Sequence, residues 1–252
     1  MNISAVIITF NEARNIGRCL ESLQGIADEV VVVDSMSTDN TREICKKAGA
    51  MVVERPWEGY SANKNHGNGL VNHEYVLSID ADEALSPTLR QSILQIKHNL
   101  NGVYGFNRLA FYGGKAVRHG GWYPDRKIRL FPKHKARWEG GFVHEELIII
   151  QSGQTASWLD GDLLHYTYDS AQEHRTKARK YARLAAVSMQ KAGKNKLILG
   201  IKALVSPIWR FGSMFFFKLG FLDGKTGWNV AKITSKEVFW KYWWAAGPRL
   251  DP

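Results

Sequence analysis

The chain opens with a repeated succession of strand and helix patterns, and this succession limits the possible folds more than any other feature. Residues 3–9 (ISAVIIT), 29–33 (EVVVV) and 75–79 (YVLSI) are continuous apolar runs rich in β-branched side chains, and residues 51–54 form a shorter one. Such runs are typical of parallel strands that are buried on both faces. Because helical patterns separate them, we expect an α/β fold: a mostly parallel sheet with helices on both faces.

Local signals place the helices of this first part. A helix is expected near residues 15–23. Ser37 or Thr38 can cap the helix that follows the second strand. Ser86 followed by Pro87 predicts the start of another helix, because proline is favoured at the first helical position.

The predicted secondary structure changes along the chain. Residues 103–168 show short strand patterns separated by glycine pairs, and three helical segments follow near 170–192, 196–220 and 228–244. We therefore predict two parts, an α/β domain over residues 1–168 and a helical region over 169–252.

Composition excludes several classes of protein. With 44% hydrophobic and 23% charged residues, the chain is neither disordered nor fibrous. The two cysteines lie in helical patterns without metal-ligand spacing, which indicates a reducing compartment and no disulfide framework. The most apolar stretch, residues 208–222, contains Arg210 and Lys218 and so lacks the uncharged run of about 20 residues that a spanning helix needs. Without a signal peptide pattern at its start, the protein is expected to be cytoplasmic.

The net charge of +10 is concentrated at one end of the chain. Residues 1–164 hold 18 Lys and Arg against 19 Asp and Glu, whereas residues 165–252 hold 16 against 5. Many aromatic residues are interspersed with these cations, a combination that favours binding to an anionic membrane surface. Two alternatives stay open: a solvated basic face over an ordinary helical core, and a nucleic-acid-binding patch.

Polar side chains follow the predicted strands at the sheet edge where α/β proteins bind ligands. No GxGxxG or Walker loop follows the first strand, so a dinucleotide or P-loop site is not expected. Asp80 and Asp82 leave the fourth strand together, and paired carboxylates at a strand tip can hold Mg²⁺ or Mn²⁺ against phosphate oxygens. The other polar residues at this edge are Thr9, Asn11, Glu12 and Asp34.

Several motifs, taken together, resemble a known family. VIITFNEARNI, VVVDSMSTDNT, the pair Lys64-Asn65 and LSIDADE look like the nucleotide-sugar-binding half of a family 2 glycosyltransferase with the GT-A fold. GGWYPDRKIRLFPK, WEGGFVHEEL, LLHYTYDS and GFLDGKTGW are similar to the small bacterial enzymes that glucosylate the inner core of lipopolysaccharide. The resemblance covers nearly the whole chain.

The resemblance implies a UDP-sugar donor site with a divalent cation, Mg²⁺ or Mn²⁺. Asp80 and Asp82 match the family's DxD motif, the first toward the ribose and metal and the second as the metal ligand on the diphosphate. Arg126 and Arg129 lie where a cation could meet the diphosphate or an acceptor phosphate. The residues expected to line the nucleotide pocket are Thr9, Asn11, Glu12, Asp34 and Lys64.

Glu145 falls where the family places its catalytic base. In an inverting transfer a carboxylate takes the proton of the acceptor hydroxyl while metal and cations stabilise the departing diphosphate. Glu146 is the alternative base, although on a strand its side chain would face the opposite side. His144 could orient the base, bind the metal or serve a structural role.

These features lead to the hypothesis of a metal-dependent, inverting, non-processive hexosyltransferase that moves glucose from UDP-glucose onto the lipopolysaccharide inner core. It is expected to lie peripherally on the inner face of the bacterial inner membrane and to bind no nucleic acid. Another lipid-linked or polysaccharide acceptor is the nearest alternative. A nucleotidyltransferase lacks support because no Gly-rich loop follows the first strand, and a nucleic-acid-binding protein would rest on the basic C-terminal region alone. The oligomeric state stays open.

Overall fold

The computed structural model describes residues 1–140, 145–150 and 155–250, and the chain divides into two compact units. The first contains Met1–Arg108 and Asp125–His165, and the second contains Leu109–Pro124 and Tyr166–Pro252. The sequence pattern suggested a single boundary near residue 168 and did not indicate that the segment 109–124 groups with the C-terminal helices.

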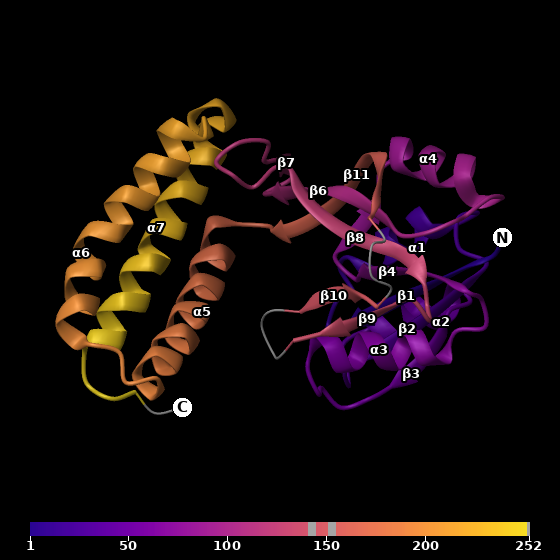
Figure 1. Ribbon diagram of the computed structural model, residues 1–252, viewed down its shortest axis with the longest axis horizontal. Helices are drawn as coiled ribbons and strands as arrows, with labels where there is room; N and C mark the ends of the chain where they lie inside the picture. Colours follow the sequence, from indigo (N-terminus) through magenta and orange to yellow (C-terminus); the bar gives the residue numbers. More distant parts are fainter. Residues whose placement is uncertain (141–144, 151–154, 251–252) are drawn as a thin grey trace. The chain divides into compact units, whose positions relative to one another are not determined.

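A mixed sheet forms the centre of the first unit (Figure 1). Its strand order is β3-β2-β1-β4-β8-β6-β11-β5; the first four of these strands run parallel, whereas β8 lies antiparallel to both β4 and β6. The strands are β1 (Ile3–Thr9), β2 (Glu29–Asp34), β3 (Met51–Glu54), β4 (Tyr75–Asp80), β5 (Glu83–Leu85), β6 (Tyr104–Tyr112), β8 (Asp125–Pro132) and β11 (Ser157–Tyr168).

Helices cover both faces of this sheet. Ile3, Ala5 and Ile7 of β1 share one apolar core with residues of α1 (Ile16–Leu23), α2 (Thr41–Lys47) and α4 (Pro87–Lys97). Val6, which points to the other face, packs with the side that carries α3 (Tyr60–Leu70) and the two-stranded sheet of β9 (Ala136–Glu139) and β10 (Glu146–Ile149). The expected α/β architecture, with a GT-A-like sheet and helices on both sides, is therefore confirmed.

Local sequence signals predicted the first residue of some helices but not of others. Ser86 caps α4 as expected, with its Oγ accepting the Leu89 N–H at 3.2 Å. The helix after β2 begins later than expected, at Thr41, because Ser37 instead donates to the carboxylate of Asp34. Helix α3 was not expected, since its sequence, YSANKNHGNGL, has little apolar periodicity.

The second unit is built on three long helices, α5 (Ala171–Lys191), α6 (Lys196–Gly212) and α7 (Gly224–Ala246), with α7 packed against both others (Figure 1). A π-helical turn, η1 (Ser213–Phe217), extends α6, and a short 3-10 turn, η2 (Gly220–Asp223), leads into α7. The short strand β7 (Lys115–Ala116) pairs with the end of β6. These helices match the three helical segments expected from the sequence.

An aromatic cluster forms one core of this unit. The His174 ring stacks on Tyr168 with centroids 4.3 Å apart, and Tyr112 and Trp122 complete the cluster. Burial lowers the pKa of His174 to about 4, so the imidazole is neutral near pH 7.

The position of α3 depends on a glycine. A Cβ on Gly67 would lie 2.4 Å from Val6 Cγ1 and 3.1 Å from Val33 Cγ2, so only glycine lets the helix approach the sheet this closely. Gly69, two residues later in the same helix, has no atom within 4 Å of its corresponding position. The close approach sets the depth at which Lys64, one turn earlier, meets the end of the sheet.

This difference can be tested with two variants of the same helix. We expect Gly67→Ala to lower the free energy of unfolding by about 1–3 kcal/mol, because the methyl group overpacks the helix against β1 and β2. Gly69→Ala should leave it unchanged or raise it by up to about 1 kcal/mol, since alanine favours the helix. Urea unfolding of both variants measures the effect, and equal stabilities would contradict the close approach.

Candidate active site

The loops after β1 and β2 are joined around Asp34. Thr9 and Asp34 are register partners on the two strands, and both are buried. Asp34 accepts the Ser37 N–H at 2.8 Å on Oδ1 and the Ser37 hydroxyl at 2.5 Å on Oδ2. Both carboxylate oxygens therefore organise the loop, and the predicted contact of Asp34 with a base or ribose stays a prediction.

Asn11 and Glu12 connect the same two loops. Asn11, in the left-handed region at φ 54°, donates its N–H to Ser37 Oγ at 2.8 Å and accepts the Thr38 N–H at 2.8 Å on Oδ1. The Glu12 N–H donates to Thr41 Oγ1 at 2.9 Å. The structure thus brings together Thr9, Asn11, Glu12 and Asp34 at one edge of the sheet, as the strand ends predicted.

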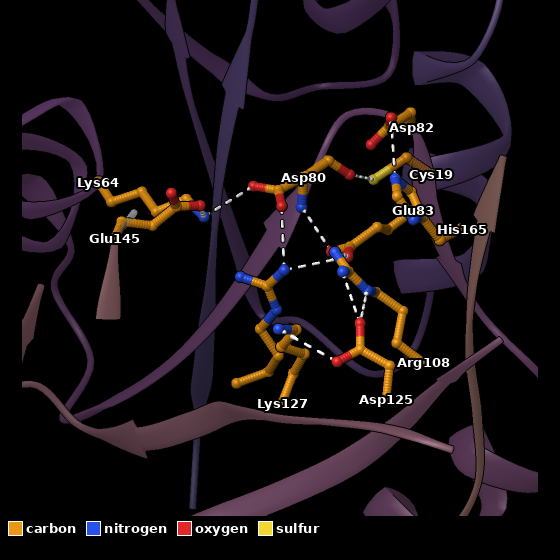
Figure 2. A network of polar contacts seen from close by, with 11 residues as sticks. Cys19, Lys64, Asp80, Asp82, Glu83, Arg108, Asp125, Lys127, Glu145 and His165 are labelled. Carbon is orange, nitrogen blue, oxygen red and sulfur yellow. Dashed lines mark hydrogen bonds and ion pairs between the residues drawn. The ribbon is translucent and has the colours of Figure 1, made fainter. Parts of the chain in front are cut away.

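Lys64 and Asp80 form the centre of a second cluster at this edge (Figure 2). Lys64 is only 1% exposed, and its Nζ lies 3.0 Å from Asp80 Oδ1. The other carboxylate oxygen, Oδ2, accepts from Arg129 Nη2 at 2.9 Å. A buried cation and a strand-end carboxylate therefore satisfy each other, with a second buried cation on the far oxygen.

The charges of this cluster are stabilised by each other. Burial alone would raise the pKa of Asp80, but the Lys64 ammonium and the Arg129 guanidinium hold it well below its ordinary value. Burial alone would lower the pKa of Arg129, but Glu83 and Asp80 raise it above its ordinary value. Both groups stay charged across the physiological pH range.

Glu83 contacts both Arg129 and Asp80 of this cluster. It was not assigned a role from the sequence. Its fully buried carboxylate accepts from Arg129 Nη2 at 3.0 Å on Oε1 and from the Asp80 N–H at 3.0 Å on Oε2. Arg108 lies 3.5 Å from the same Oε1 and also pairs with Asp125 at 2.6 Å. The signal in the sequence was an acidic residue that opens a short apolar strand directly after the paired aspartates.

Glu145 reaches the cluster from a different part of the chain. Its Oε1 lies 3.5 Å from Lys64 Nζ, so one ammonium bridges Glu145 and Asp80 (Figure 2). Glu146, the alternative base, is exposed at the start of β10. His144 lies outside the described residues.

Asn65 of α3 holds strand β9 beside the Lys64 cluster. Its side chain donates to the Trp138 carbonyl at 2.8 Å and accepts the Trp138 N–H at 2.9 Å, which ties β9 to α3. The Trp138 ring then lies over Lys64, with 4.4 Å between Nζ and the ring centroid. Asn65 was quoted only as part of a motif, and its positioning role depends on tertiary contacts.

Asp82 lies apart from the Lys64 pair and faces His165 instead (Figure 2). Asp82 Oδ2 is 3.3 Å from His165 Nε2. Within the ranges that the structure describes, no group of three or more His, Cys, Asp or Glu side chains is arranged to hold a metal ion. Asp82 and His165 together offer one carboxylate and one imidazole, and the role of His165 was not recognised from the sequence.

Next to these residues lies a cavity of about 570 Å³. Four of its lining residues are cations, and Glu145 and Glu146 also line it, so the cavity suits an anionic group that must approach a carboxylate. Arg126 is exposed, with its guanidinium carbon 5.0 Å from the Trp158 ring centroid, whereas Arg129 is buried in the carboxylate cluster. The cationic lining consists of Arg108, Arg126, Lys127 and Arg129.

The support from Glu83 can be measured as stability. Glu83→Gln removes the charge that faces Arg129, and we expect a loss of about 1.5–3 kcal/mol in the free energy of unfolding, because the amide nitrogen cannot accept either the Arg129 or the Asp80 N–H and the buried guanidinium loses a charged partner. Glu139→Gln, at an exposed pair with Arg137, is the control and should cost less than about 1 kcal/mol. Chemical denaturation checks both, and a Glu83 variant as stable as the control would remove Glu83 from this supporting role.

Comparisons with known proteins agree with this geometry. Residues 4–149 match the family model Glycosyl transferase family 2. An uncharacterized glycosyltransferase of Rickettsia conorii is 33% identical over 89% of this chain and 83% of its own length. The lipopolysaccharide core biosynthesis glycosyltransferase LpsC of Rhizobium meliloti is 28% identical over 99% of this chain and 96% of its own length.

Among solved structures, a glucosyl-3-phosphoglycerate synthase from Mycobacterium tuberculosis, in complex with Mn²⁺, UDP and glucosyl-3-phosphoglycerate, aligns at 25% identity with a TM-score of 0.36 over 44% of each chain. The family match spans more than half of the chain and contains β1 to β10, with the whole Lys64, Asp80 and Glu145 cluster. The chain is therefore a glycosyltransferase and belongs to glycosyl transferase family 2.

Proposed function

We propose that this enzyme is a metal-dependent, inverting hexosyltransferase that moves glucose from UDP-glucose onto the inner core of lipopolysaccharide. The observation that carries the proposal is the bridge made by Lys64, whose ammonium contacts both Asp80 at the end of β4 and Glu145 beside the cationic cavity. It brings a carboxylate that can act as a base to the sheet edge where the donor is expected to bind.

The acceptor is proposed from the relatives. The protein named for lipopolysaccharide core biosynthesis matches this chain over nearly its whole length, including the helical region. The inner core carries sugar hydroxyls and anionic groups, and the cavity is lined by cations. Another lipid-linked glycan is the second candidate, since the same donor site would serve it.

The chain's own residues can perform a direct displacement. Glu145 accepts the proton of the acceptor hydroxyl as its oxygen bonds to the anomeric carbon, and the bond from that carbon to the diphosphate breaks with its electron pair on the diphosphate. Attack opposite the leaving group inverts the anomeric centre. The nearby cations of the cavity, among them Lys127 and Arg126, offset the charge that develops on the diphosphate.

Asp82, with His165 beside it, is proposed to hold the divalent cation. A single carboxylate beside the substrate fits Mg²⁺ or Mn²⁺, which are commonly held by one or two carboxylates and by the phosphates of the substrate. Asp80, the other predicted ligand, has both oxygens engaged by Lys64 and Arg129. When bound, the cation neutralises the diphosphate and so favours its departure.

The proposed place of action is the inner face of the bacterial inner membrane, with the enzyme bound peripherally. The second unit supports this proposal, because it contains the basic and aromatic helices α5 to α7. A nucleic-acid-binding function would not explain the carboxylate cluster around Asp80, so this function is not favoured.

The role of Glu145 can be separated from that of its neighbour. Glu145→Gln should lower turnover by about 10²–10⁴-fold, because the amide cannot accept the hydroxyl proton, while affinity for UDP-glucose stays nearly unchanged. The matched variant Glu146→Gln should retain most of its activity, since Glu146 lines the same cavity but is exposed, whereas Glu145 contacts Lys64. Kinetics with a purified core acceptor, together with calorimetric donor titration, measure both effects. Normal turnover of the Glu145 variant would exclude it as the base.

Calorimetric titration tests the donor and the metal together. We expect UDP-glucose to bind in the presence of Mn²⁺ or Mg²⁺ and to bind at least about tenfold more weakly without the cation or to Asp82→Ala. His165→Ala should weaken the metal dependence in the same direction. Asp160→Ala changes an exposed carboxylate of β11 and serves as the control. Metal-dependent binding that is unaltered in the Asp82 variant would place the cation elsewhere.

A further inference from the structure

The outward face of α6 and η1 is unusually apolar for a helix exposed to water. A stripe of aliphatic and aromatic side chains along it is 52–76% exposed. Their spacing follows the helical period, so they lie on one side of the helix. We call this set the α6 face; it consists of Leu197, Ile198, Ile201, Leu204, Val205, Ile208, Trp209, Phe216 and Phe217.

The opposite side of the same helix is already used for packing. Leu199 and Ala203 are buried, and α6 packs along α7. The helix is therefore apolar on both sides, whereas a helix at the surface of a soluble unit normally carries polar residues on its outer side. Contiguous exposed apolar surfaces of this kind mark binding sites for protein or membrane.

The charge of the second unit identifies the kind of partner. The unit holds 18 Lys and Arg against 5 Asp and Glu, whereas the first unit holds 16 against 19. No Asp or Glu occurs between Glu173 and Asp223, the stretch that contains nearly all of α5 and the whole of α6 and η1. Exposed cations flank the α6 face and include Lys194, Lys196, Lys202, Arg210 and Lys218.

These properties fit one partner better than others. A second copy of the chain would bring two strongly positive units together, which like-charge repulsion opposes. Nucleic acid would satisfy the cations but gives the exposed aliphatic side chains no apolar environment. An anionic bilayer offers both parts at once, phosphates for the cations and acyl chains for the α6 face.

The helix has features of an interfacial element. By length and composition Lys196–Phe217 could cross a membrane, and it is the one such helix among the described residues. However, Lys202 and Arg210 interrupt it, and α7, which covers its inner side, carries exposed Lys232 and Lys236. A shallow groove of about 310 Å³ between α6 and α7, lined by Leu204, Pro207 and Phe239 among others, offers room for part of an acyl chain.

We propose that the α6 face is the membrane-docking surface of this enzyme and that α6 lies in the headgroup region of an anionic bilayer without crossing it. The proposal deepens the proposed function and rests on its acceptor being a membrane glycolipid. Docking through this face would hold the enzyme at the surface where that acceptor is displayed.

A site-specific fluorophore reports contact with lipid directly. Cys19 and Cys45 are buried, so a cysteine introduced by Ile208→Cys can be labelled selectively with an environment-sensitive dye. The matched control is Leu184→Cys, at a half-exposed apolar position of α5, which lies on the other side of α7 from α6 (Figure 1). Vesicles of phosphatidylcholine and phosphatidylglycerol should shift the emission of the Ile208 label to the blue and leave the Leu184 label unchanged. Equal responses of the two labels would overturn the assignment to this face.

Vesicle sedimentation of the full chain measures the affinity. The triple variant Ile201→Ser, Leu204→Ser, Ile208→Ser should bind these vesicles at least about tenfold more weakly than the unaltered chain, and Leu184→Ser should bind normally. Vesicles of phosphatidylcholine alone should bind the unaltered chain at least about tenfold more weakly, because they offer no anionic headgroups to the lysine and arginine side chains. Calorimetric binding of UDP-glucose should be the same in all variants, so loss of vesicle binding with intact donor binding is distinct from failure of the proposed function.

Other results would assign the α6 face differently. A second copy of the chain would be the partner if two results occurred together. The emission of the Ile208 label would already be blue-shifted relative to the Leu184 label without vesicles, and sedimentation equilibrium would show a dimer that the triple variant abolishes. Membrane fractions that keep the protein after alkaline carbonate extraction would indicate a spanning helix. Vesicle binding that the triple variant leaves unchanged would also overturn the proposal.

Discussion

The buried ammonium of Lys64 is the interaction on which the active-site region depends. A cation that is 1% exposed needs carboxylates beside it to stay charged, and Asp80 at the end of β4 and Glu145, the residue before β10, supply them. The helix that carries Lys64 reaches this depth because Gly67 allows it to touch Val6 of β1. One charge thus links a helix, the central sheet and the small β9–β10 sheet.

The same cluster illustrates how several charges can stay ionised at low exposure. Each carboxylate has at least one cation, and Arg129 lies between Asp80 and Glu83. Alternating signs lower the cost of burial for every member, and they also fix the directions of the side chains. In the proposed reaction, the diphosphate would meet cations that are already oriented, which reduces the reorganisation that the reaction requires.

The two units differ in charge as well as in architecture. The first has a small net negative charge and contains the carboxylates of the active-site region, whereas the second contains all of the chain's net positive charge and its exposed apolar helix. Such a division suits an enzyme with one substrate soluble in water and another embedded in a membrane. The acidic residues of the proposed donor site would be repelled by the anionic surface that is proposed to attract the helices.

The sequence alone determined the features that depend on neighbours along the chain. Apolar runs such as ISAVIIT identified the strands, their ends located Asp34, Asp80 and Asp82, and the capping pair Ser86-Pro87 located a helix. Tertiary structure decided which of these residues meet. The bridge from Lys64 to Glu145 joins positions 81 residues apart, the burial of Glu83 depends on Arg129 from another strand, and His165 meets Asp82 only through the fold. Periodicity reports the environment of a segment, whereas pairing between distant segments is set by packing, as the close contact of Gly67 with Val6 demonstrates.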